Sequence, residues 1–165
     1  MDYIKQSFTF DLDTIFNVAR LYSAKIASHV ISQDGTSQES KLALTDADRV
    51  LWDVSVRYPS NTVYNYLMSA GKIQDNDYQF GVLVSGKKSI IYTLYLHPDW
   101  DKNLSRGLND SIEKAIVYGG LADWYKLSGS QAYEMTVSEY KDALRECSKA
   151  INLRKHKTFR KHITF

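Results

Sequence analysis

Cysteine, proline and glycine are scarce in this chain: its 165 residues include one cysteine, two prolines and eight glycines. The single cysteine, Cys147, excludes an intramolecular disulfide framework and favours a reducing compartment such as a cytoplasm. No apolar run approaches the roughly 20 residues that a transmembrane helix needs, and neither end reads as a signal peptide. We therefore expect no membrane segment. The scarcity of proline and glycine favours long regular elements.

What is present is typical of one folded domain. Hydrophobic residues make up 44% and charged residues 24% of the sequence. These values are close to those of soluble globular proteins, and they exclude intrinsic disorder and collagen-like repeats. The length corresponds to a single domain. Twelve tyrosines indicate extensive amphipathic aromatic surface, because a tyrosine packs through its ring and hydrogen-bonds through its hydroxyl.

The charge is distributed unevenly along the chain. The net charge is +2, but residues 147–165 hold six basic residues and no acidic one, which leaves −4 on residues 1–146. We predict a folded domain over 1–153 and a basic tail over 154–165. Three interpretations of the tail stay open: a solvating end, a segment that docks on another protein, or a contact to nucleic acid. Interleaved aromatic residues favour docking, and the candidate docking residues are Arg154, Lys155, Lys157, Phe159, Arg160, Lys161 and Phe165.

Spacings of three and four residues predict amphipathic helices in the first half of the chain. The first covers residues 12–31 and follows Asp11. A capping box at Thr45 opens the second. Pro59 should end or kink this helix, and Gly71 should end its continuation. The second helix continues with an apolar helical face, made of Ala47, Val50, Leu51, Val54 and Tyr58.

The hydrophobic period changes from about 3.6 to two within residues 78–96, which predicts a β-hairpin. Gly86, as the first central residue of a two-residue connection, suits a type II′ turn. An isolated hairpin is only marginally stable and has two open edges, so helices must cover it or another chain must pair with it. Residues 1–10 are also more apolar than a free terminus should be, so we expect them to pack against something.

Two long helices are predicted in the last third of the chain. The first opens at Asp110, with Glu113 at capping-box spacing, and is apolar nearly all round, which predicts a central position. Gly119 and Gly120 would let another backbone approach it closely. The second has a heptad-like seam for antiparallel packing on the first, made of Tyr133, Val137, Tyr140, Leu144, Cys147 and Ile151. The elements together predict a mainly α fold: an antiparallel bundle of about four helices with the 78–96 hairpin inserted.

No catalytic or metal-binding motif is apparent. Residues 81–87 match the first seven positions of a phosphate-binding loop, but Lys88 stands where a Ser or Thr should hold magnesium, and a strand follows where a helix N-terminus is needed. The four histidines are scattered. Cys147 lies on the apolar seam, where we expect a buried hydrophobe rather than a catalytic thiol. We predict no enzymatic activity, no cofactor and no metal site.

A subunit interface is predicted around the hairpin, because residues 90–96 are apolar on both faces. The connection that follows, residues 97–107, carries the large aromatic Trp100. A residue of this kind either fills the core from a loop or anchors a partner, and both interpretations stay open. The candidate interface residues are Tyr78, Phe80, Val82, Ile90, Tyr92, Leu94 and Trp100.

The order of these elements resembles that of the head–tail connector adaptor, or neck ring, proteins of tailed bacteriophages. The stretch over residues 110–129 carries the resemblance, with an aromatic pair, Trp124 and Tyr125, before a short glycine turn. It is followed by residues 132–144 and by Leu153 leading into the basic tail. The similarity covers most of residues 10–165 and rests on element order and apolar pattern.

The resemblance implies a virion structural protein that forms a homo-oligomeric ring, of about twelve subunits in this family. Such a ring joins the portal protein to adjacent neck or tail proteins and lines the DNA passage, with non-specific contact to DNA in the channel. Its location is the neck of the virion, after assembly in the host cytoplasm. The alternative is a small nucleic-acid-binding or regulatory helical protein that acts through the basic tail.

Overall fold

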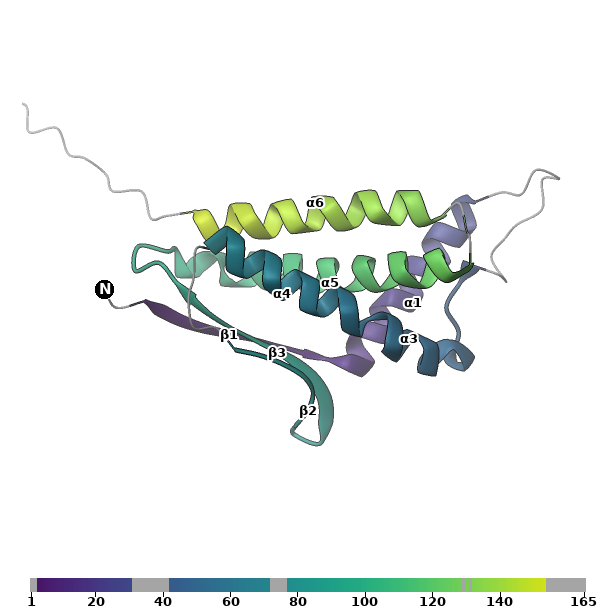
Figure 1. Cartoon of the computed structure of the whole chain (residues 1–165), viewed down its shortest axis with the longest axis horizontal. Coiled ribbons are helices and arrows are strands. Elements are labelled where there is room, and N and C mark those ends of the chain that lie inside the picture. The colour runs from purple at the N-terminus through teal and green to yellow at the C-terminus, as the bar shows by residue number, and fades with distance from the viewer. Residues whose placement is uncertain (1–2, 31–41, 72–76, 129, 131, 154–165) are drawn as a thin grey trace, which may run out of the picture.

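A computed structural model describes residues 3–30, 42–71, 77–128, 130 and 132–153 of the chain. This part is mainly helical, as predicted, and contains five α-helices and a three-stranded antiparallel sheet (Figure 1). None of the described helices is long and apolar enough to cross a membrane. The elements are β1 (Ile4–Asp11), α1 (Leu12–His29), α3 (Arg49–Ser55), α4 (Arg57–Gly71), β2 (Asp77–Val84), β3 (Lys87–Leu96), α5 (Ser105–Ser128) and α6 (Ala132–Asn152).

The sheet has the strand order β1-β3-β2, so the predicted hairpin gains a third strand from the start of the chain. The register of β1 on β3 runs from Ile4 opposite Leu96 to Asp11 opposite Ser89. Residues 1–10 were expected only to pack against something. Their alternation, which buries Phe8 and Phe10, is that of a strand with one inward face. The pairing covers one edge of β3 within the chain itself.

The connection between β2 and β3 differs from the predicted type II′ turn. Its two central residues are Ser85 and Gly86, with φ of 51° and 80°. Positive φ at both positions defines a type I′ turn, in which Gly86 is the second central residue. A bulge lies nearby, between Phe80 and Val82, where Gly81 has φ of 74°.

Tyrosines hold α4 on the inner face of the sheet. The ring of Tyr64, on α4, stacks with Tyr78 and Tyr92 at centroid distances of 5.3 and 6.2 Å. The Tyr92 hydroxyl donates to the Ser60 carbonyl at 2.8 Å, and the Tyr78 hydroxyl bonds the Ser60 hydroxyl at the same distance. Burial raises the pKa of Tyr92 well above its usual value. These three tyrosines therefore serve packing inside the chain.

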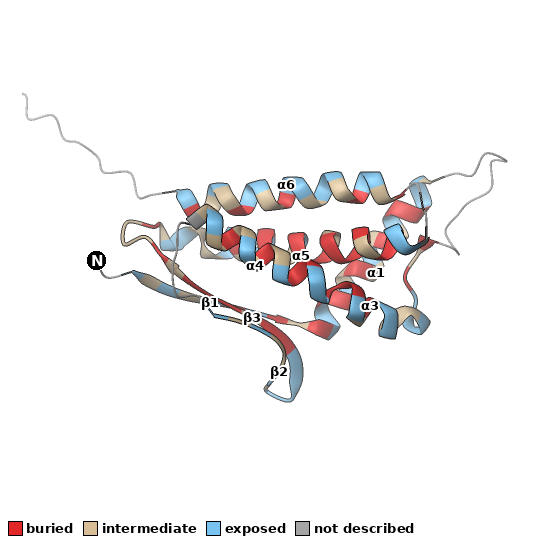
Figure 2. Ribbon diagram, viewed as in Figure 1, coloured by how far each residue is buried: buried red, intermediate tan, exposed pale blue. Residues whose placement is uncertain are grey.

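Helix α5 is central, as predicted, and is largely buried (Figure 2). It begins at Ser105 rather than Asp110. The Asp101 carboxylate accepts from the Asn103 N–H at 3.0 Å and caps a short 3₁₀ turn that leads directly into α5. The helix therefore begins upstream of the capping box predicted at Asp110.

Gly119 and Gly120 of α5 do allow a close approach, but the side chains of other helices make this approach rather than another backbone. A Cβ at Gly120 would lie 2.6 Å from the Trp52 ring.

Helix α6 runs antiparallel to α5 and packs along it (Figure 1). Cys147 is buried there as predicted, and burial raises the pKa of its thiol to about 12. A thiol of this kind stays protonated and is a poor nucleophile.

Trp100 is fully buried against the same helix, and its indole N–H donates to the Ala150 carbonyl at 2.9 Å. Of the two interpretations of Trp100, the structure supports the core-filling one.

The predicted helix is interrupted at Val56, three residues before Pro59, rather than at the proline itself. Helix α3 ends at Ser55 and α4 begins at Arg57, which places Pro59 in the first turn of α4. The first N–H groups of a helix have no partner within it, so proline is tolerated there. Gly71, the predicted end, is the last described residue of α4.

Candidate interaction surface

Four apolar residues of α3 and the start of α4 face solvent. Their exposed fractions are 80% for Val50, 45% for Leu51, 69% for Val54 and 73% for Tyr58. Val54 follows Leu51 by three residues and Val50 by four, which places these three side chains together on the outer side of α3, and Tyr58 follows at the start of α4. We call these four residues the α3–α4 surface. This apolar face does not pack on the core of the chain.

The opposite side of α3 is buried instead. Trp52, Ser55 and Val56 are at most 1% exposed, and the Trp52 ring lies on Gly120 of α5. Only the missing side chain of a glycine leaves room for an indole at this distance. The larger Trp52 therefore takes the core position, which turns Val50 and Val54 outward.

A groove adjoins the α3–α4 surface, with a volume of about 550 Å³. Its floor and walls are aromatic and amphipathic, and Arg57 lies over the Phe80 ring at 5.8 Å from the centroid. No described carboxylate lies within ion-pair distance of Arg57. Beyond the groove, Leu83 near the hairpin tip is 73% exposed. The groove is lined by Val54, Arg57, Tyr58, Asn61, Tyr78 and Phe80.

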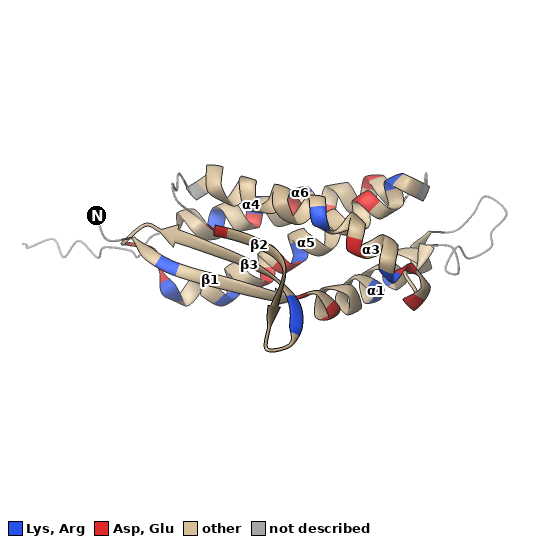
Figure 3. Ribbon diagram, turned by 60° about the horizontal axis from the view of Figure 1, so that its bottom comes forward, with Lys and Arg blue, Asp and Glu red and all other residues tan. Residues whose placement is uncertain are grey.

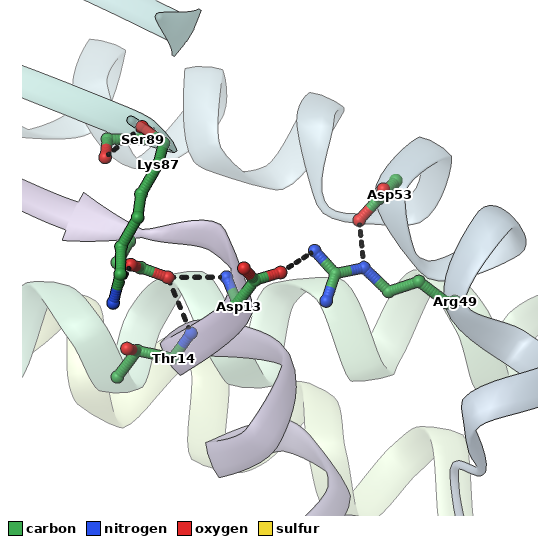
Figure 4. A network of polar contacts seen from close by, with 7 residues as sticks. Asp13, Thr14, Arg49, Asp53, Lys87 and Ser89 are labelled. Carbon is green, nitrogen blue, oxygen red and sulfur yellow. Dashed lines mark hydrogen bonds and ion pairs between the residues drawn. The ribbon is translucent and has the colours of Figure 1, made fainter. Parts of the chain in front are cut away.

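A chain of polar contacts fixes α3 against α1 (Figure 4). Arg49 of α3 pairs with Asp13 of α1 at 2.7 Å and with Asp53 at 3.0 Å, and its guanidinium lies 4.8 Å from the Phe16 ring centroid. A second pair joins Arg20 to Asp46 at 2.7 Å. Acidic and basic residues are accordingly interspersed where α3 meets α1 (Figure 3). These contacts orient the α3–α4 surface outward.

Asp11 links the start of α1 to the hairpin. Its carboxylate accepts from the N–H groups of Asp13 and Thr14 at 2.8 and 2.9 Å and pairs with Lys87 at 3.0 Å. The Thr14 N–H, Lys87 and the Asp13 N–H lower the pKa of Asp11 below 3.8. The stabilisation that depends on the charged form is therefore complete above pH 3.8 and is lost as the pH falls through the lower, folded-state pKa.

Two replacements of Asp11 separate the cap from the charge. Asp11→Ala is expected to lower the free energy of unfolding by about 0.5–2 kcal/mol, because an N-cap is lost. Asp11→Asn keeps a capping oxygen and loses the charge, so its deficit against wild type should shrink from pH 7 to pH 3. Urea denaturation at both pH values measures this. A deficit that grows toward acid would contradict the role of the charge.

The structure separates the predicted interface residues into two groups. Ile90, Tyr92, Leu94 and Trp100 have no exposed area, and side chains buried within one chain are not available to a neighbouring subunit. That part of the prediction is corrected: helices of the same chain cover this face of β3, and Trp100 packs against α6. The other three residues, Tyr78, Phe80 and Val82, are half-buried, and the first two line the groove.

The predicted tail residues lie outside the described residues, namely Arg154, Lys155, Lys157, Phe159, Arg160, Lys161 and Phe165.

Sequence reasoning missed the outward orientation of Val50, Leu51, Val54 and Tyr58. A signal was present, because Trp52 and Val56 put apolar side chains on a second side of the same short helix. A helix at the surface of a single chain needs only one apolar side.

Within the described part of the chain, no group of three His, Cys, Asp or Glu side chains is placed to hold a metal ion. Comparison with known proteins adds no relative from which a role could be transferred. The chain matches no protein-family model, no curated protein and no solved structure at a significant level.

Proposed function

We propose that this chain is a structural subunit of a homo-oligomeric ring, of the kind formed by bacteriophage head–tail connector adaptors. Its place is the virion neck, between the portal protein and the adjacent neck or tail proteins, with DNA passing through the centre. On this proposal α1, α4, α5 and α6 correspond to the antiparallel bundle of about four helices predicted from the sequence, and the basic tail docks on a neighbouring protein.

The observation that carries the proposal is the exposed α3–α4 surface with its groove. Contiguous exposed apolar side chains mark interaction sites, because leaving them in water is unfavourable. Tyrosine, phenylalanine and arginine are enriched at protein interfaces, and Tyr58, Phe80 and Arg57 meet at this groove. A subunit that assembles with copies of itself needs such a surface.

The solution mass of the full chain tests the proposal. The wild type should sediment as an oligomer and appear in electron micrographs as closed rings with a central opening wide enough for duplex DNA. Val54→Asp should sediment as a single chain, because assembly would bury an unpaired carboxylate at a cost of several kcal/mol, roughly. The fold should be kept, since Val54 is 69% exposed.

A matched control is Leu127→Asp. Leu127 is 67% exposed near the end of α5, outside the α3–α4 surface and its groove, so this variant should assemble as the wild type does. The proposal fails if the wild type remains a single chain at all concentrations, or if Val54→Asp assembles as well as Leu127→Asp.

A further inference from the structure

A second groove lies between α1, α5 and α6, with a volume of about 380 Å³. One wall is the stacked pair of Tyr22 and Tyr118, whose ring centroids are 5.2 Å apart. Met135, 45% exposed, lines the side formed by α6. We call it the α1–α5–α6 groove. Its charged lining residues are Lys25, Lys114 and Glu139.

The α3–α4 surface and the α1–α5–α6 groove lie on opposite sides of the molecule. Helix α5 separates them: Trp52 of α3 packs on Gly120, whereas Tyr118 stacks with Tyr22 of α1. In Figure 1, α3 and α4 accordingly lie in front of α5, and α1 lies behind it. Two surfaces placed in this way on one chain can be occupied at the same time by two different copies.

One pair of charges on the two surfaces is complementary. The acidic residues near the α3–α4 surface are already engaged, since Asp46 pairs with Arg20 and Asp53 with Arg49. Arg57 beside that surface and Glu139 in the α1–α5–α6 groove have no ion-pair partner among the described residues. The α3–α4 surface therefore offers an unpaired cation, and the groove offers an unpaired carboxylate.

We propose that the α3–α4 surface of one copy docks into the α1–α5–α6 groove of the next, so that the subunit interface is head-to-tail. This inference rests on the proposed ring and adds which two surfaces meet in it. Apolar side chains of α3 and α4 contact the Tyr118 and Met135 side of the groove. Arg57 of one copy pairs with Glu139 of the next. Head-to-tail contacts between unlike surfaces close into rings when the rotation between copies allows it.

Mixing two assembly-deficient variants of the full chain tests this interface. Val54→Asp disables the α3–α4 surface and leaves the groove intact. Glu139→Lys disables the groove, because it places an ammonium group opposite Arg57, and it leaves the α3–α4 surface intact; Glu139 is exposed, so the fold should be kept. Each variant alone should sediment as a single chain. An equimolar mixture should form dimers of one copy of each variant, because only one intact pair of surfaces remains and the dimer cannot grow. Lys141→Glu, an exposed charge reversal outside the groove, should assemble as the wild type.

The outcomes separate this inference from the proposed function. If Glu139→Lys forms wild-type rings while Val54→Asp does not, the head-to-tail pairing is wrong, but the proposed ring is not contradicted. If both variants are single chains and their mixture also stays so, the two surfaces do not meet. A wild type that never assembles overturns the proposed ring and, with it, this interface.

Discussion

Replacing Leu94 by lysine is expected to unfold the protein or nearly so. Leu94 is fully buried on the central strand β3, on the face that packs against the helices. The substitution removes an apolar side chain from the core and puts in its place an ammonium group, or a neutral amine whose pKa is lowered by burial. We expect a loss of roughly 5 kcal/mol in the free energy of unfolding, a large part of the about 5–15 kcal/mol typical of a domain.

Thr9→Lys is the matched control, because Thr9 is exposed on the outer face of the edge strand β1. Lysine is well tolerated at exposed sheet edges, so this change should stay within about 0.5 kcal/mol of wild type. Circular dichroism during urea denaturation measures both variants. A folded Leu94→Lys protein with the wild-type midpoint would show that this face of β3 is not core.

Replacing Gly120 by alanine is expected to destabilise the protein, although alanine ordinarily favours a helix. The added Cβ would lie 2.6 Å from Cη2 and 3.0 Å from Cζ3 of Trp52, and that ring is fully buried. A rigid ring in a packed core must shift to make room, which costs about 1–3 kcal/mol. Gly119 is similarly confined, since a Cβ there would lie 2.7 Å from Cβ of Pro59.

Gly107→Ala is the control in the same helix. Nothing lies within 4 Å of a Cβ at Gly107, so this change should stabilise the protein by up to about 1 kcal/mol through helix propensity. The two alanines should therefore shift the thermal midpoint in opposite directions, which differential scanning calorimetry measures. Equal shifts of one sign would contradict the close packing of Trp52 on α5.

The two faces of α3 show where sequence reasoning reaches its limit. Val50, Leu51, Val54 and Tyr58 have helical spacing, and so do the larger Trp52 and its neighbours. Periodicity identifies both sides as apolar without ranking them. Gly120, far along the chain, decides between them because it accommodates the Trp52 ring. The α3–α4 surface is the apolar side that stays exposed when Trp52 packs on Gly120.

The helices, the hairpin, an interruption near Pro59 and the burial of Cys147 could be predicted from the sequence, because hydrophobic period and turn chemistry act between near neighbours. Only the tertiary structure decided that β1 completes the sheet and that β3 is its central strand. It also decided that Trp100 fills the core from its loop. These outcomes depend on contacts between residues up to about 90 positions apart, such as Ile4 with Leu96, and no local pattern specifies which partner a buried side chain will have.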